Sequence, residues 1–328
     1  MGSKRIEWID LAKGFCIFLV VLNHVSQYAK VDYPLANQLQ AFRMPLYFIL
    51  SGLFFKQYED FVGFLKRKTN KLLIPFLFFL VCTSLLPYWA QYHKFQWPLL
   101  CGKAPFYNGP IWFLLCLFEV NVLFFLIQWL AGIISQRYKA GIVLYLTLLF
   151  GVGGLLLSYF KLQIPFYVDT AFTCLPFFVF GWWMNRHTRF LAYRVNLWRD
   201  VPLLIAGAVI LWLFAERVEY VRNFYVRDGI WYIHLTGIVG TVMVLTLARL
   251  IKRLPLVSYW GRYSIMILCT HLLVIRGIVY LAKGHISGWV LFTVLLATTL
   301  AVCHFLIPLM KRYMPHVTAQ KDVIKIEK

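Results

Sequence analysis

Long apolar stretches recur along the whole of this 328-residue chain, and they limit its fold more than any other feature. A helix needs about 20 mostly apolar residues to cross roughly 30 Å of hydrocarbon. Hydrophobic residues make up 61% of the chain and charged residues only 14%, which is far from the balance of a soluble domain. We therefore expect an all-α fold, a polytopic bundle of helices that cross a membrane.

The apolar stretches predict about ten transmembrane helices, near residues 9–29, 43–56, 72–92, 111–131, 140–160, 167–185, 201–215, 229–249, 257–281 and 288–310. No long polar stretch separates them, so we expect a single integral-membrane domain over residues 1–328. The first stretch contains charged residues and lacks a cleavage site of small residues. It is therefore interpreted as a retained span and not as a signal peptide.

The net charge of +20 would suggest nucleic acid in a soluble protein, but in a membrane protein the position of the charges matters more. Segments rich in Lys and Arg alternate with poorer ones; they are Lys4 with Arg5, 66–71, 186–199, 249–253 and the tail from Lys311. With ten spans all of them fall on one side, so the positive-inside rule places both termini in the cytoplasm. The expected surrounding is a lipid bilayer, with no nucleic acid partner.

Cysteine spacing gives no sign of a metal site, because the seven cysteines form no C-x-x-C pair. Nearly all of them fall inside the predicted spans, where we interpret them as small apolar core residues. We expect no bound metal.

The first span, "DLAKGFCIFLVVLNHV" at residues 10 to 25, carries polar groups at both ends. A charge near the bilayer centre costs at least about 2.5 kcal/mol, so such groups usually face the bundle interior. Lys13 and His24 are eleven residues apart, which places them within roughly 20° of one face and roughly 16 Å apart along the axis. Asp10 is positioned to pair with Lys13 near the cytoplasmic mouth. Alternatively, Asp10 and Lys13 sit at the membrane interface and His24 caps the outer end.

A second basic cluster lies in "FLKRKTNKLLIPF", residues 64 to 76, where Arg67 and Lys71 are four apart on one helix face. Such a pair suits a phosphate group, although positive-inside anchoring would also explain it. A basic mouth with an imidazole roughly 16 Å deeper matches a donor that has a phosphorylated head and a long reactive arm. Acyl-coenzyme A is such a molecule, and a narrow Phe-lined shaft favours its acetyl form.

Acyl transfer from a thioester to an alcohol needs a base and a group that stabilises the oxyanion. His24 is the candidate base. The candidates for the oxyanion site or for substrate contacts are Asn23, Arg43, Ser51 and backbone groups near Gly52, although Asn23 lies about 100° around the helix from His24.

Two more polar residues lie within predicted spans. Glu119 is inside the fourth span, where it would orient His24, contact the acceptor, or form a structural pair with an Arg or Lys. His271 can reach the depth of His24, either as a substrate contact or as a hydrogen-bonded core histidine.

Five motifs in order resemble the acyltransferase 3 family, in particular its fucose 4-O-acetylase-like branch. They are Lys13 to His24 with the preceding Asp10, "FRMPLYFILSGLFF" at 42–55, Arg67 and Lys71 before Pro75, "GPIWFL" at 109–114, and "WGRYSIMILCTHLLVI" at 260–275, which contains Gly261, Ser264 and His271. The second basic position is more often Arg in the family, whereas this chain has Lys71.

The resemblance implies a ten-helix enzyme that transfers an acetyl or other acyl group from acyl-coenzyme A to a hydroxyl, usually of a sugar. It implies that His24 is essential and that Lys13, Arg67 and Lys71 bind the donor. The expected acceptor is a carbohydrate or a glycolipid, and the expected location is the inner, plasma membrane of a bacterium. The alternative is a transporter or flippase in which His24, Glu119 and His271 form a relay.

Overall fold

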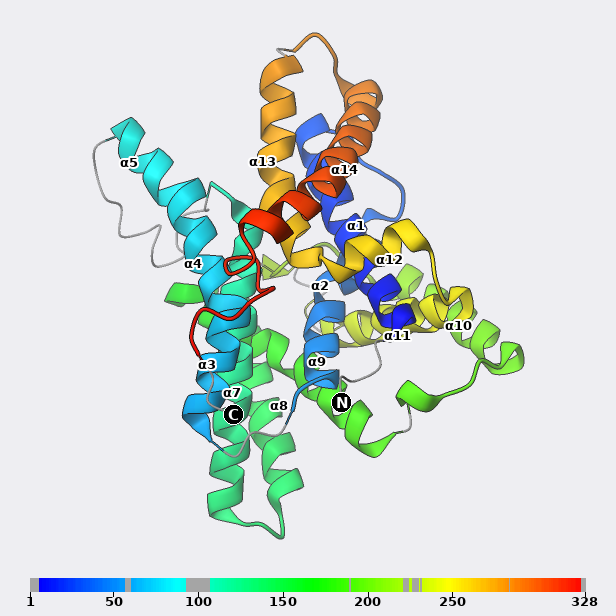
Figure 1. Ribbon diagram of the computed structural model, residues 1–328. Coiled ribbons are helices and arrows are strands. Elements are labelled where there is room, and N and C mark those ends of the chain that lie inside the picture. Colours follow the sequence, from blue (N-terminus) through cyan, green and yellow to red (C-terminus); the bar gives the residue numbers. More distant parts are fainter. Residues whose placement is uncertain are drawn as a thin grey trace. The chain divides into compact units, whose positions relative to one another are not determined.

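The computed structural model of the chain describes residues 6–56, 60–92, 107–188, 190–220, 224–225, 230, 232–282 and 284–325. These residues are mostly helical, with one small two-stranded sheet, which confirms the all-α class (Figure 1). Lys4 and Arg5, two residues of the charge pattern, lie outside the described ranges.

The elements follow one another as α1 (Glu7–Ala29), α2 (Ala36–Leu53), α3 (Phe61–Lys68), η1 (Thr69–Leu73), α4 (Ile74–Leu80), η2 (Val81–Leu85), α5 (Leu86–Tyr92), η3 (Gly109–Ile111), α7 (Trp112–Ile134), α8 (Lys139–Tyr159), η4 (Pro165–Tyr167), α9 (Val168–His187), η5 (Phe190–Ala192), α10 (Leu197–Phe214), β1 (Val218–Glu219), β2 (Phe224–Tyr225), α11 (Ile233–Ile251), α12 (Pro255–Arg262), α13 (Ser264–Ala282) and α14 (Gly288–Tyr313).

Within the described ranges, eight helices are long and apolar enough to cross a membrane. They match eight of the ten predicted spans. The other two predicted spans fall on helices as well, α2 and α9, but α2 carries Asn37, Gln38 and Arg43 in its first half, and α9 carries Asp169 and Arg186. The chain is therefore a multi-pass membrane protein, whereas the count of ten and the sides of the termini remain predictions.

The predicted single span over 257–281 is wrong in its boundaries, because the structure has two helices there. α12 starts with Pro255 in its first turn and ends at Arg262, and the φ of −116° and ψ of 30° at the next residue, Tyr263, lie outside the helical range. α13 begins at the next residue. An apolar run is continuous across such a break, so hydropathy alone does not reveal it.

The chain divides into two compact units, which we describe separately. The first unit consists of Met1–Tyr47, Leu191–Val218 and Trp231–Tyr313, and the second consists of Phe48–Phe190, Glu219–Ile230 and Met314–Lys328. The division falls within α2.

In the first unit, α1 packs against α11, α12, α13 and α14. The contact with α12 brings the two backbones together: a Cβ atom at Gly261 would overlap the Asp10 carbonyl oxygen, and one at Gly14 would overlap the Val257 carbonyl. Small residues permit this kind of close helix packing inside membranes. α1, which carries four of the predicted site residues, is thereby held in its N-terminal half.

In the second unit, α7 packs against α8 and α9, and also against η1 of the long helix that runs from α3 to α5. Asp60 caps the start of α3, because its carboxylate accepts hydrogen bonds from the Val62 and Gly63 amides at 3.0 and 2.5 Å. The η1 segment is a π-helical turn, a feature that is frequent at functional sites.

Candidate active site

The two predicted histidines meet in the first unit. The rings of His24 on α1 and His271 on α13 have their centroids 5.2 Å apart and are tilted by 42°. His271 is fully buried, whereas His24 is partly exposed. The structure thus brings the candidate base together with the histidine whose role the sequence left open.

The hydrogen bond of His271 defines its tautomer. Its Nδ1 lies 2.7 Å from the carbonyl oxygen of Ile267, one turn earlier on α13. A carbonyl only accepts, so Nδ1 carries the proton and Nε2 has a lone pair. In the described part of the chain Nε2 is buried and has no hydrogen-bond partner. Buried polar atoms are usually satisfied, so an unsatisfied nitrogen beside His24 is a candidate contact for a substrate.

A second contact links α1 and α13 one turn beyond the histidine pair. The Nε of Arg276 donates a hydrogen bond of 2.6 Å to the hydroxyl oxygen of Tyr28, which lies four residues after His24. Neither residue was predicted from the sequence, although a charged residue inside an apolar span is a signal that would have identified Arg276.

Arg43 belongs to the same surroundings. Its carbonyl oxygen accepts a hydrogen bond of 2.6 Å from the thiol of Cys16, which connects α2 to α1. The positive charges of Arg43 and Arg276 both act on the His24 imidazole. Preorganised positive charge stabilises an oxyanion where it lies close to the oxygen on which the charge develops, so both arginines are candidates for this task.

The other predicted residues of α1 lie along the same helix. The Lys13 carbonyl accepts a hydrogen bond of 3.3 Å from the Tyr47 hydroxyl of α2. Asp10 is buried one turn before Lys13, and Asn23 is buried next to His24 in the sequence, with only 3% of its surface exposed.

The second unit contains a basic pocket of about 330 Å³. It is lined by Ser51, Lys56, Arg67, Lys68, Lys71, Leu72, Leu117 and Asp322. Three of these, Ser51, Arg67 and Lys71, are predicted site residues, while Lys56, Lys68 and Asp322 are additions from the structure. Four cations around one pocket can bind a phosphorylated group.

Glu119 of α7 also lies in the second unit, and a carboxylate acts on it electrostatically, that of Asp169 at the start of α9. Its Oε2 atom is buried and has no hydrogen-bond partner among the described residues. The alternative prediction was a structural pair of Glu119 with an Arg or Lys. No such pair is seen among the described residues. His24 and Glu119 belong to different units, so the proposed action of Glu119 on His24 remains a prediction.

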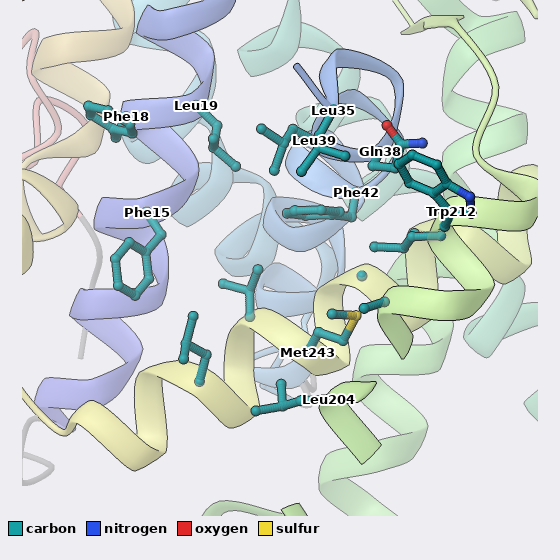
Figure 2. A pocket seen from close by; sticks show the side chains of 15 residues that line it. Phe15, Phe18, Leu19, Leu35, Gln38, Leu39, Phe42, Leu204, Trp212 and Met243 are labelled. Atoms are coloured by element: carbon teal, nitrogen blue, oxygen red, sulfur yellow. The ribbon is translucent and has the colours of Figure 1, made fainter. Parts of the chain in front are cut away.

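The first unit also has an apolar groove of about 480 Å³ between α1, α2, α10 and α11. Figure 2 shows aromatic, leucine and methionine side chains around it, among them Phe15, Phe42 and Met243. Phe15 is nine residues before His24, which puts it roughly on the opposite face of α1. The groove is therefore separate from the histidine pair. No group of three or more His, Cys, Asp or Glu residues that could hold a metal occurs in the described ranges.

These features define a multi-pass membrane protein with a histidine pair in one unit and a basic pocket in the other. The chain belongs to the acyltransferase 3 family, because the family model described as "Acyltransferase domain" matches residues 6–307. Membership of this family implies membrane acyltransferase activity. Searches of curated proteins and of solved structures gave no match.

Proposed function

We propose that this protein is a membrane O-acetyltransferase, which moves an acetyl group from acetyl-coenzyme A to a hydroxyl of a carbohydrate or glycolipid acceptor in the cell envelope. The observation that carries this proposal is the histidine pair of the first unit, with ring centroids 5.2 Å apart and one unsatisfied ring nitrogen. The proposed location is the plasma membrane of a bacterium.

In the proposed reaction, His24 accepts the proton of the acceptor hydroxyl as this oxygen attacks the thioester carbonyl. A carbon–oxygen bond forms, the carbon–sulfur bond breaks, and the thiolate of coenzyme A takes up the proton from His24. The lone pair of His271 Nε2 accepts a hydrogen bond from the acceptor hydroxyl or from the protonated His24. The charge of Arg43 stabilises the oxyanion, with Asn23 as a further candidate.

The donor is proposed to bind through its phosphate groups to Arg67 and Lys71 in the basic pocket, with Ser51 beside them, while Lys13 of the first unit stays a predicted donor-binding residue. Support comes from the pocket itself, because the two residues singled out as a phosphate-binding pair line it together. Asp10 is proposed to hold Lys13, and Glu119 to contact the acceptor or to orient the base.

A glycolipid acceptor is compatible with the apolar groove of the first unit, because α1, α10 and α11 are candidate membrane spans and an acyl or isoprenoid chain matches an apolar lining.

Mass spectrometry of envelope glycans and glycolipids tests the proposal. Cells with the wild-type protein should show an acetyl increment that is absent without the protein and absent with His24→Ala. An unchanged spectrum in all three strains would contradict it.

A further inference from the structure

The segment after α14 returns to the basic pocket of the second unit and places a carboxylate there. Asp322 lines the pocket, and its Oδ1 lies 3.1 Å from the Nζ of Lys71. The same Nζ donates a hydrogen bond of 3.0 Å to the carbonyl oxygen of Ala319. Among the pocket-lining residues that the structure describes, Asp322 is the only acid.

One buried side chain holds this segment in place. Asn70 is 1% exposed and precedes Lys71 in the π-helical turn η1. Its Oδ1 accepts hydrogen bonds from the Val323 and Ile324 amides at 3.0 and 2.9 Å, and its Nδ2 donates one of 2.9 Å to the Ile324 carbonyl. The Asn70 side chain thus both accepts and donates hydrogen bonds with the backbone of Val323 and Ile324. These bonds hold the segment against the turn that carries Lys71.

The ion pair between Lys71 and Asp322 is one in which another anion can replace the carboxylate. The side chains of Lys71 and Asp322 are 50% and 42% exposed, and exposed ion pairs are weak and screened by salt. A phosphate group carries more negative charge and more acceptor oxygens than a carboxylate, so it competes well for the same ammonium group.

We propose that Asp322 is a built-in counter-ion that sets the affinity of the basic pocket for phosphorylated ligands. The Asp322 carboxylate pairs with Lys71 when the pocket is empty and separates from it when a phosphate binds. Asn70 keeps the segment that carries Asp322 close to the pocket in both states. This inference rests on the proposed function, because it takes coenzyme A as the ligand.

The test is a titration of coenzyme A into the full-length protein in nanodiscs at low ionic strength. Asp322→Asn should tighten binding by about 2- to 5-fold, the range expected for losing a weak competing ion pair. The gain should shrink as salt is raised and should vanish in a Lys71→Met background. Glu216→Gln, which removes an equal charge from an exposed site in the other unit, should leave the affinity unchanged.

Asn70→Ala gives an independent readout. It should speed amide hydrogen exchange at Val323 and Ile324 and should tighten coenzyme A binding in the same direction. If Arg67→Ala weakens binding but Asp322→Asn leaves it unchanged or weaker, the counter-ion inference alone is overturned. If the wild type does not bind coenzyme A at all, the proposed donor is overturned, and this inference with it.

Discussion

His271 shows how much a single hydrogen bond decides at the scale of the residue. The sequence placed this histidine at the depth of His24 but left two roles open, because a linear pattern contains no information on which ring nitrogen is bonded. The Ile267 carbonyl resolves the tautomer by binding Nδ1, and the buried Nε2 is the atom that remains for chemistry. The pairing of Arg276 with Tyr28 could not be predicted for a similar reason, since it joins residues 248 positions apart.

Replacing His271 by Asn is expected to lower kcat by about 10- to 100-fold, with little change in acetyl-coenzyme A affinity. Asn can still donate to the Ile267 carbonyl but has no atom at the Nε2 position, and a hydrogen bond to a charged group is worth roughly that factor. Steady-state kinetics and donor titration measure the two effects. His271→Gln, which reaches further, should retain more activity, and full activity in His271→Asn would show that Nε2 has no part in the reaction.

Replacing Arg67 by Ala should weaken acetyl-coenzyme A binding by about 10-fold or more and should change acceptor preference little. The guanidinium lines the basic pocket, where a charge-assisted hydrogen bond to phosphate is lost. Lys66→Ala on the same helix is the matched control, because Lys66 is not among the residues that line this pocket. If Arg67→Ala instead mainly changed the acceptor preference, the pocket would bind the acceptor and not the donor.

The contact between α1 and α12 is the clearest feature at the scale of the element. Hydropathy predicted an apolar helix over 257–281, but the chain breaks at Tyr263, which lets α12 lie against α1 as a separate short helix. Gly261 is part of the sequence motif, but only the structure shows why a glycine is needed there. The Cα of Gly261 faces the Asp10 carbonyl and leaves no room for a side chain. Such a position depends on two elements at once, and one element's periodicity cannot reveal it.

Gly261→Ala should therefore destabilise the protein by about 1–3 kcal/mol, the usual range for overpacking. The added methyl group meets backbone atoms of α1, which cannot rotate away. Thermal unfolding in detergent would report this as a lower Tm.

Gly277→Ala in α13 is the matched control, since nothing lies within 4 Å of a Cβ at that position. It should be neutral or stabilising by up to about 1 kcal/mol, because alanine favours the helix. Equal Tm values for the two variants would contradict the close contact between α1 and α12.

At the scale of the whole molecule, the composition was sufficient to predict an all-α membrane protein. The alternation of segments rich and poor in Lys and Arg added a prediction of which side of the membrane each terminus lies on. The number of spans is harder, because α2 and α9 carry polar residues that a bundle interior tolerates and a hydropathy threshold rejects. The two compact units were not foreseen, since no polar linker separates them in the sequence.

Labelling of introduced cysteines decides whether α2 crosses the membrane. Asp32 and Lys56 flank this helix, and both are exposed. With ten spans and a cytoplasmic N-terminus, a membrane-impermeant maleimide added to intact cells should label Asp32→Cys and spare Lys56→Cys, with the wild type as background. Labelling of both or of neither would mean that α2 does not cross.

His24 is the general base of the proposed acetyl transfer from acetyl-coenzyme A, and the whole mechanism depends on this role. It is tested most directly by the rate at which labelled acetyl-coenzyme A acetylates envelope glycans or glycolipids in membrane vesicles with wild-type protein or with His24→Gln. The proposed mechanism predicts a loss of about 10²- to 10⁴-fold in the rate, while the affinity for coenzyme A stays unchanged. A His24→Gln protein that transfers acetyl at the wild-type rate would contradict it.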